Sequence, residues 1–260
     1  MSSRGSRYRQ TTVGSVFCDA IKHELEVDVC VINGATIKGE TEYEGTNSMS
    51  YGALQKELPF PTKMVVVPMK RWELQEAVRY SRTKNPPLQL DADGKSTETD
   101  SDPVERKGYL QLDVDFDRVG YHSGYYNDDL MVAVPRNLLN GFCKIKPLMV
   151  VAERLKTLGK FPADDDFIRA IDLIVRHCCK EQWFEMVAQA PFQELDEDGK
   201  GFLNRSDVKR LLQKAIGHEP ADFLVDDMIA AIDTDGNGII DADEYSHLLA
   251  HMEREHGVAV

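Results

Sequence analysis

One stretch of twelve residues decides the fold of the C-terminal part of the chain: Asp233-Thr234-Asp235-Gly236-Asn237-Gly238-Ile239-Ile240-Asp241-Ala242-Asp243-Glu244. Its oxygen-bearing groups recur at the spacing that Ca²⁺ needs, since this hard cation takes about six to eight oxygen ligands. The predicted ligands are the backbone carbonyl of Ile239 and the side chains of Asp233, Asp235, Asn237, Asp241 and Glu244. Gly238 allows the sharp turn between the two halves of the loop. The stretch therefore predicts a calcium site.

Apolar residues recur at helical spacing on both sides of this loop. Before it they are Phe223, Met228, Ile229 and Ile232, and after it they are Tyr245, Leu248, Leu249 and Met252. An acidic loop that arises by chance has no reason to lie between two amphipathic helices. A loop with both helices resembles the EF-hand, so we predict the strong Ca²⁺ site of the chain at 233–244.

A second loop of the same kind lies upstream, at residues 196–207. Its predicted ligands are the carbonyl of Phe202 and the side chains of Asp196, Asp198, Asn204 and Asp207. Lys200 stands where a side-chain oxygen is expected, and Asp207 is one methylene shorter than the glutamate that ends the later loop. We therefore predict a weaker site for Ca²⁺ or Mg²⁺. Because EF-hands work in pairs, we also predict that Leu203 and Ile240 meet across the two loops.

Composition narrows the class of protein. The chain has 260 residues, a formal net charge of −13 and five cysteines. The negative charge argues against nucleic acid or an anionic membrane as a partner. No apolar run reaches the roughly 18 residues of a membrane span, and the polar start does not resemble a secretory signal. An odd cysteine count without Cys-x-x-Cys spacing predicts free thiols. We expect a cytoplasmic protein as the chain is written, or an extracellular one if an N-terminal part is missing.

The first half of the chain alternates between helical and strand patterns. Expected helices are 16–25, 50–58 and 71–82, and expected strands are 27–32, 63–68, 109–116 and 130–135. Residues 85–107 are rich in turn-forming residues and predict a mobile loop, and further helices are expected at 148–158 and 166–189. We therefore predict an α+β fold: a mixed-sheet domain at 1–160, a linking helix at 161–190 and an all-α EF-hand pair at 191–256.

Four segments of the first half form a recognisable succession. They are Gly14-Ser-Val-Phe-Cys-Asp19-Ala20, Val31-Ile-Asn33-Gly34-Ala-Thr-Ile-Lys38-Gly39, Ser50-Tyr-Gly52 with Leu58-Pro59-Phe60, and Leu110-Gln-Leu112. In order and spacing they resemble the C-terminal domain of the 5′-nucleotidase family, over roughly residues 5–150. The resemblance implies that domain's mixed sheet and a site for a purine nucleoside or nucleotide.

The resemblance also implies four substrate-binding residues, which are Asn33, Lys38, Phe60 and, from a segment further upstream, Arg7. An aromatic face stacks on a purine, and cations meet anionic groups. Lys38 replaces an arginine of the family and so lacks its planar fork. The family's Gly-Gly-Asp-Gly-aromatic segment is replaced by Asn140-Gly-Phe142-Cys-Lys, in which only Phe142 could complete a base pocket. The alternative is that Asn33, Lys38 and Phe60 remain as part of the family's scaffold and that this domain binds no nucleotide.

In that family a metallophosphoesterase domain holds two metal ions and performs the hydrolysis. This chain contains no Asp-x-His, Gly-Asp or Gly-Asn-His-Glu array, so we expect no catalytic residues in it. The first hypothesis is a regulatory calcium-binding protein, with a protein partner docking on an EF-hand groove lined by Met228 and Met252. The alternative is the C-terminal portion of a calcium-tuned 5′-nucleotidase whose catalytic domain is missing from this chain. A third reading is passive calcium buffering.

Overall fold

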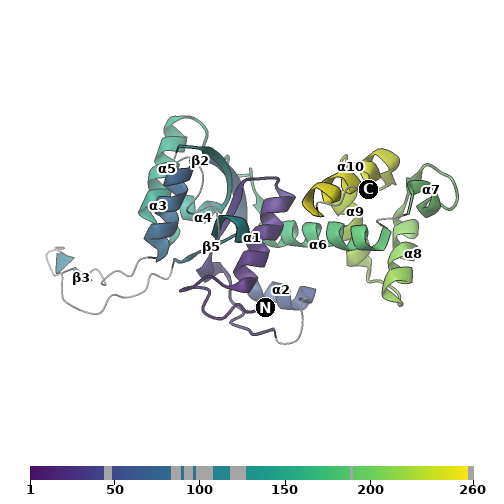
Figure 1. Ribbon diagram of the computed structural model, residues 1–260, viewed down its shortest axis with the longest axis horizontal. Helices are drawn as coiled ribbons and strands as arrows, with labels where there is room; N and C mark the ends of the chain where they lie inside the picture. Colours follow the sequence, from purple (N-terminus) through teal and green to yellow (C-terminus); the bar gives the residue numbers. More distant parts are fainter. Residues whose placement is uncertain are drawn as a thin grey trace. The chain divides into compact units, whose positions relative to one another are not determined.

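The computed structural model describes residues 1–43, 49–82, 89–90, 96–97, 108–117, 127–187 and 190–256. The chain divides into two compact units, Met1–Ile171 and Asp172–Val260. The first unit combines a five-stranded sheet with helices, and the second is helical apart from one short pair of strands (Figure 1). The α+β class predicted from the sequence is confirmed.

The sheet of the first unit has the strand order β5-β1-β6-β2-β7. Its strands are β1 (Val29–Asn33), β2 (Lys63–Lys70), β5 (Leu110–Leu112), β6 (Asp129–Pro135) and β7 (Ile168–Arg169). β1 and β6 run parallel, whereas the other neighbours pair antiparallel, so the sheet is mixed as expected. The pairing of β2 with β6 places Met64 opposite Pro135, and Lys63 and Arg136 therefore follow at the same end of these strands.

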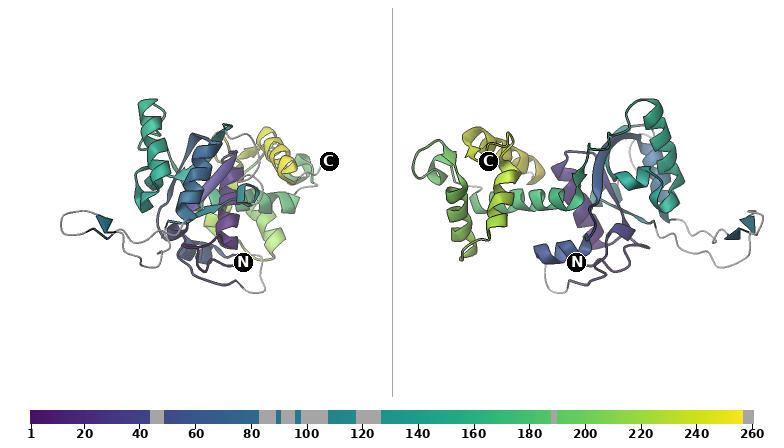
Figure 2. Two further views of the ribbon diagram at one scale, coloured as in Figure 1. Left: turned by 60° about the vertical axis from the view of Figure 1, so that its left-hand side comes forward. Right: turned by 180° about the vertical axis from the view of Figure 1, so that it is seen from behind.

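Helices cover both faces of this sheet. α3 (Arg71–Arg82) and α5 (Lys146–Thr157) pack side by side over one face, and α1 (Thr12–Glu24) lies against β1 and β5 on the other (Figure 2). Alternate strand residues such as Val65, Val67 and Val132 join α3 and α5 in one buried cluster. Since both faces are covered, all five residues of β1 are buried and the strand shows no polar alternation.

Among the described strands, β2 has β7 as a neighbour only at its first two residues, Lys63 and Met64. Further along, β2 contains Pro68, which has no backbone N–H to offer. The Pro68 carbonyl accepts a hydrogen bond from the Arg154 guanidinium at 3.2 Å, and Arg154 also pairs with Glu73 at 2.7 Å. α5 is thereby tied to the outer side of β2.

Helix boundaries follow the capping signals in the sequence. The Ser50 side chain accepts the Ala53 N–H at 3.3 Å and caps α2 (Tyr51–Glu57), which lies within the helix expected at 50–58. α3 has the bounds that its apolar spacing predicts. α1 begins earlier than predicted, at Thr12, because the Thr11 side chain accepts the Gly14 N–H at 3.1 Å.

The strand expected at 109–116 is shorter than predicted, and its residues are more buried than its alternation of apolar and polar residues indicates. β5 comprises only Leu110–Leu112, and all three residues are buried. Gln111 has the polarity of a solvent-facing residue, but its amide nitrogen donates to the carbonyls of Ser6 at 2.7 Å and Arg9 at 2.6 Å. A polar side chain with partners inside the core breaks the rule that polar strand residues face water.

The helix expected at 166–189 begins later than predicted. Ile168 and Arg169 form β7 on the edge of the sheet, and the Ala170 N–H donates to the Thr62 carbonyl at 2.8 Å. Pairing with β2 therefore takes these residues before α6 (Ala170–Val187) starts. Of the loop expected at 85–107, the structure describes only the small pair β3 (Gln89–Leu90) and β4 (Ser96–Thr97), and the other residues lie outside the described ranges.

The second unit is built from helices around two loops. After α6 come α7 (Phe192–Leu195), α8 (Arg205–Ile216), α9 (Asp222–Ile232) and α10 (Ala242–His256). Strands β8 (Phe202–Leu203) and β9 (Ile240–Asp241) pair antiparallel between the loops. Trp183, Met228 and Met252 lie in the buried cluster of this unit. None of the described helices combines the length and apolar character needed to cross a membrane.

Candidate functional site

Three carboxylates of loop 233–244 converge. One oxygen from each of Asp233, Asp235 and Glu244 lies within 4.8 Å of the others. Within the described ranges, this is the one group of three or more His, Cys, Asp or Glu side chains arranged to hold a metal ion. Because carboxylate oxygens are the ligands that Ca²⁺ prefers, this donor set fits that ion.

Backbone amides hold the first of these carboxylates in place. Asp233 Oδ1 accepts the N–H of Gly236 at 2.7 Å, and Oδ2 accepts that of Gly238 at 2.7 Å. Both glycines have positive φ, 75° and 82°, which turns their N–H groups inward at little conformational cost. Burial alone raises the pKa of Asp233, but the amides of Gly238, Gly236 and Asn237 together bring the pKa below its usual value.

Glu244 closes the loop from its other end. It is 6% exposed, and its Oε1 accepts both the N–H of Thr234 at 2.6 Å and the Thr234 hydroxyl at 3.0 Å. Its Oε2 accepts the Asp241 N–H at 3.2 Å. The Asn237 side-chain oxygen accepts the Ile239 N–H at 2.9 Å, so the remaining predicted ligands belong to the same hydrogen-bonded loop.

Loop 196–207 is arranged differently, because a lysine lies among its acidic residues. Lys200 Nζ is 2.7 Å from Asp198 Oδ2 and 3.1 Å from Asp207 Oδ2. The hydrogen bond from Lys200 lowers the pKa of Asp198, and the same bond raises the pKa of Lys200. Asp196 accepts the N–H groups of Lys200 at 3.1 Å and Gly201 at 2.7 Å.

Two of the predicted ligands in this loop also cap α8. The Asn204 side-chain oxygen accepts the N–H of Ser206 at 2.8 Å and of Asp207 at 3.2 Å. In turn, Asp207 Oδ2 accepts a hydrogen bond from the Asn204 N–H at 3.1 Å, which completes a capping box. Phe202 lies in β8, opposite Asp241. Asn204 and Asp207 thus have a structural role that needs no metal.

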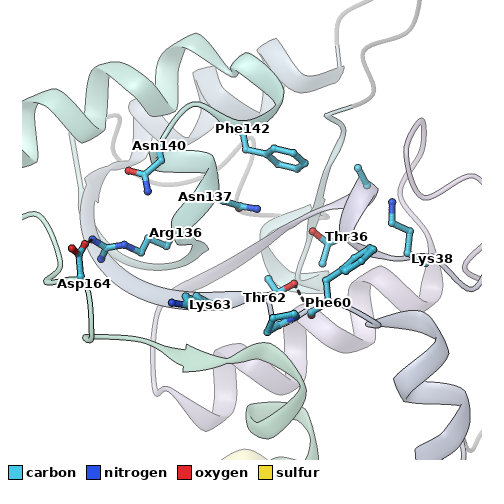
Figure 3. Close-up of a pocket in the computed structure, with 12 residues that line it drawn as sticks. Thr36, Lys38, Phe60, Thr62, Lys63, Arg136, Asn137, Asn140, Phe142 and Asp164 are labelled. Atoms are coloured by element: carbon cyan, nitrogen blue, oxygen red, sulfur yellow. Dashed lines mark hydrogen bonds and ion pairs between the residues drawn. The ribbon is translucent and has the colours of Figure 1, made fainter.

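A pocket of about 500 Å³ lies in the first unit (Figure 3). Its lining comes from β2, from α4 (Arg136–Leu139) and from the segments around η1 (Gly34–Thr36) and η3 (Phe142–Lys144). The lining residues are Ala35, Thr36, Lys38, Phe60, Pro61, Thr62, Lys63, Arg136, Asn137, Asn140, Phe142 and Asp164. Phe60 and Phe142 are 61% and 49% exposed, and such open aromatic faces suit a flat ring as ligand.

Three cations and one carboxylate line this pocket. Lys38 Nζ lies 5.8 Å from the centroid of the Phe60 ring. Lys63 is the second cation, and Arg136 is the third, paired with Asp164 at 2.5 Å. The lining therefore carries net positive charge in a chain whose formal charge is −13, which favours an anionic ligand here.

The structure brings two of the four substrate residues implied by the resemblance into the pocket. Lys38 and Phe60 line it, whereas Asn33 and Arg7 are not among its lining residues. Asn33 is fully buried, its Oδ1 accepts the Ala35 N–H at 3.1 Å, and its Nδ2 lies 3.4 Å from Cys143 Sγ. Asn33 therefore caps η1 and links it to the segment that carries Phe142.

Arg7 and Lys38 both act on that same segment. Burial raises the pKa of the Cys143 thiol, while the hydrogen bond from Asn33 and the charges of Arg7 and Lys38 oppose this increase. Cys143 adopts a left-handed φ of 62°, which is uncommon for a residue with a side chain. Asn33 is thus hydrogen-bonded to the segment next to Phe142, and Arg7 and Lys38 place positive charge near it.

Lys63, Arg136, Asn137 and Asn140 were missed by sequence reasoning. They belong to no shared motif, and only the antiparallel pairing of β2 with β6 brings Lys63 and Arg136 to one end of the sheet. The available signal in the sequence was that Lys63 begins the expected strand 63–68 and Arg136 directly follows the expected strand 130–135.

Two family models match this chain. Residues 1–117 match the 5′-nucleotidase C-terminal domain, and residues 184–250 match the EF-hand domain pair. The second region is also 40% identical over 58 residues to troponin C of Tachypleus tridentatus, which covers 22% of this chain and 37% of that protein. It is 30% identical over 64 residues to the putative calcium-binding protein CML23 of Oryza sativa subsp. japonica, over 25% of this chain and 42% of that protein. The chain thus spans less than half the length of these relatives.

Among solved structures, the fold is similar to that of a 5′-nucleotidase precursor from Thermus thermophilus, with 16% identity and a TM-score of 0.35. The similarity covers 65% of this chain and 33% of that one. The two family models agree with the two resemblances expected from the sequence.

Proposed function

Since the chain joins a 5′-nucleotidase C-terminal domain to a calcium-binding EF-hand pair, we propose that it is a regulatory protein that senses Ca²⁺ and binds a purine nucleoside or nucleotide without hydrolysing it. The observation that carries this proposal is the convergence of Asp233, Asp235 and Glu244 oxygens within 4.8 Å. A donor set of three carboxylates with a buried final glutamate suits Ca²⁺.

The two loops have unequal metal sites in this proposal. Loop 233–244 is the strong Ca²⁺ site, with Asp233, Asp235, Asn237, Ile239, Asp241 and Glu244 as ligands. Loop 196–207 is a weaker site for Ca²⁺ or Mg²⁺, with Asp196, Asp198, Phe202, Asn204 and Asp207 as ligands. The inequality is supported by Lys200, whose ammonium group lies between two of those carboxylates.

The pocket of the first unit is the proposed nucleotide site. A purine would stack on Phe60 and Phe142, and Lys38 would meet an anionic group of the ligand. Asn33 supports this site through its hydrogen bond to Cys143, and Arg7 adds positive charge near that residue. The exposed rings and the positive lining both favour such a ligand.

Calcium would regulate a partner through the helices of the EF-hand pair. Met228 and Met252 are 1% and 0% exposed and lie in the buried cluster of the second unit. In calcium sensors, ion binding opens the helix pair and exposes a groove rich in methionine. A protein partner with an amphipathic helix is the occupant that such a groove would take.

The alternative function is the C-terminal part of a calcium-tuned 5′-nucleotidase that hydrolyses nucleotide phosphate through a metallophosphoesterase domain. The match of residues 1–117 to that family's C-terminal domain favours it. Reading the transcript upstream of Met1 tests it, since a metallophosphoesterase frame continuing into this chain would establish the alternative. A stop codon directly upstream would exclude a covalent catalytic domain.

Calorimetric titration tests the first function. Ca²⁺ should bind the chain, and AMP and adenosine should bind with and without saturating Ca²⁺, with different affinities in the two states. Phe60→Ala should abolish nucleoside binding, whereas Val150→Ala, which shortens another exposed apolar residue of the same unit, should leave it unchanged. Absence of nucleoside binding in both calcium states would contradict the nucleotide role, and equal affinities would contradict regulation between the two sites.

A further inference from the structure

A lysine side chain bridges two acidic residues of loop 196–207. Lys200 Nζ lies 2.7 Å from Asp198 and 3.1 Å from Asp207, which are the third and last residues of the ligand pattern. We propose that the Lys200 ammonium group takes the place of a metal ion and keeps this loop closed in the absence of calcium. The proposal deepens the proposed calcium function, since it states how the weaker loop is held and what a metal must displace.

The ammonium group of Lys200 bridges two carboxylates at the surface of the loop. Its side chain is 29% exposed, the Asp207 side chain is 14% exposed, and the ammonium group also lies 5.4 Å from the centroid of the Phe202 ring. An ammonium offers three hydrogen-bond donors and one positive charge, which two carboxylates and an aromatic face can satisfy. The lysine therefore neutralises part of the charge that a divalent ion would otherwise balance.

Asp207 is engaged on both of its oxygens. Oδ2 accepts from Lys200 and from the Asn204 N–H, and Oδ1 lies 3.3 Å from an Arg210 guanidinium nitrogen. A metal ion that bound both oxygens of Asp207 would have to break an ion pair with Lys200, one with Arg210 and a helix cap. Competition with these bonds, and not only the short reach of aspartate, weakens the loop as a metal site.

The calcium loop of the same unit shows the opposite arrangement. In the part of the chain that the structure describes, no Lys or Arg side chain forms an ion pair with Asp233, Asp235 or Glu244. Glu244 accepts hydrogen bonds from uncharged groups of Thr234 and Asp241 instead. Its negative charge stays available for a divalent ion, whereas that of Asp207 is already paired.

A closed first loop also prepares the second one. β8 lies within loop 196–207 and β9 within loop 233–244, where Phe202 pairs with Asp241 and Leu203 with Ile240. If Lys200 keeps the first loop folded, β8 is in place before calcium arrives. Calcium then binds to loop 233–244 when β8 is already in place to pair with β9. Little conformational entropy is therefore lost on binding.

Four variants separate this proposal from a site that is weak only because aspartate is short. Lys200→Met removes the ammonium group, and Lys200→Gln removes it and adds a side-chain oxygen. Asp207→Glu lengthens the carboxylate and keeps the lysine. Lys214→Met is the matched control, because its ammonium pairs with Glu197 at 3.0 Å and its side chain is 64% exposed.

Two measurements are made on the full chain: the melting temperature of the second unit in excess EGTA and the number and affinity of Ca²⁺ ions by calorimetry. We expect Lys200→Met and Lys200→Gln to lower the calcium-free melting temperature, and Lys200→Gln to tighten the second Ca²⁺ by at least about tenfold. Asp207→Glu alone should leave the second ion weak, and Lys214→Met should resemble the wild type. A fifth variant, Lys200→Arg, keeps the positive charge and should retain the calcium-free stability, which controls for a general packing defect at this position.

The proposal is overturned if Asp207→Glu alone fills the loop, or if both lysine variants leave the calcium-free melting temperature and the second ion unchanged. Failure of the proposed calcium function has a different signature: no ion would bind in loop 233–244 of the wild type. The EGTA measurement would still decide the role of Lys200 in that case, because it involves no metal.

Discussion

Leu203 and Ile240 lie opposite each other in the antiparallel pair of β8 and β9, and both side chains are fully buried. Each residue belongs to a different loop, so this contact joins the two loops within one buried cluster. The contact predicted from the spacing of the two loops is confirmed. A conformational change that moves the strand of one loop is therefore expected to move the paired strand of the other loop.

Ile240→Ala tests this coupling. Because the residue is fully buried, removing three carbons leaves a cavity, and we expect the free energy of unfolding to fall by about 2–5 kcal/mol. Urea titrations of the second unit's fluorescence with and without Ca²⁺ measure this. Ile239→Ala is the control, since Ile239 is only partly buried and its predicted ligand atom is a backbone carbonyl. Equal losses in the two variants would contradict a special role for the buried contact.

Glu244→Gln should weaken calcium binding by about tenfold to 100-fold, because it removes a negative charge and one carboxylate oxygen from the convergent group. Asp243→Asn removes the same charge from the neighbouring residue, which is exposed and outside the ligand pattern, and should change the affinity little. Calorimetry of both variants gives the comparison. If Asp243→Asn weakened binding as much as Glu244→Gln, general electrostatics rather than coordination would explain the site.

Two glycines of the nucleotidase-like segments should respond oppositely to alanine. A Cβ on Gly34 would lie 1.8 Å from the Ser6 carbonyl oxygen, a clash with backbone, so Gly34→Ala should destabilise the first unit by about 1–3 kcal/mol or more. Gly52 lies in α2 with nothing within 4 Å of such a Cβ, so Gly52→Ala should stabilise by about 0.5–1 kcal/mol. Thermal unfolding of the wild type and the two variants measures the expected loss of stability for Gly34→Ala and the expected gain for Gly52→Ala.

Tyr245 makes the stability of the second unit sensitive to alkaline pH. Burial raises its pKa from 10.0 to about 12, and its hydroxyl donates to the Ala190 carbonyl at 2.9 Å. The folded state favours the neutral phenol, so this stabilisation is complete below the unfolded pKa and is lost as pH rises through 10 toward 12. Tyr245→Phe should show a smaller loss of stability over that range. Denaturation curves at several pH values check it, and parallel losses in both proteins would contradict the assignment.

The calcium loop could be predicted from sequence because its ligands are contiguous. Asp233, Asp235 and Glu244 lie on one loop, so their spacing alone predicts that their oxygens meet. The position of Lys200 was equally visible, but its bridging of Asp198 and Asp207 depends on how the loop closes. Sequence spacing shows which side chains can converge on an ion. It does not show which of those side chains already form an ion pair with a neighbouring lysine.

The pocket of the first unit could be predicted only in part. Lys38 and Phe60 were found through the family resemblance, whereas Arg136 and Lys63 meet through strand register, which no local pattern reveals. The resemblance also implied that Asn33 contacts the substrate; in this structure its side chain is buried, caps η1 and is not among the residues that line the pocket. A residue that matches a family motif can thus stabilise the backbone around a site without lining the site itself.

The path of β2 has a consequence for how this domain behaves at high concentration. Beyond Met64, none of the described strands pairs with the side of β2 away from β6, so a strand from another molecule could add to the sheet there. Pro68 offers no donor there, and its carbonyl is already occupied by Arg154. An incoming strand would lose one hydrogen bond of the ladder at Pro68, which disfavours growth of an intermolecular sheet along this side of β2.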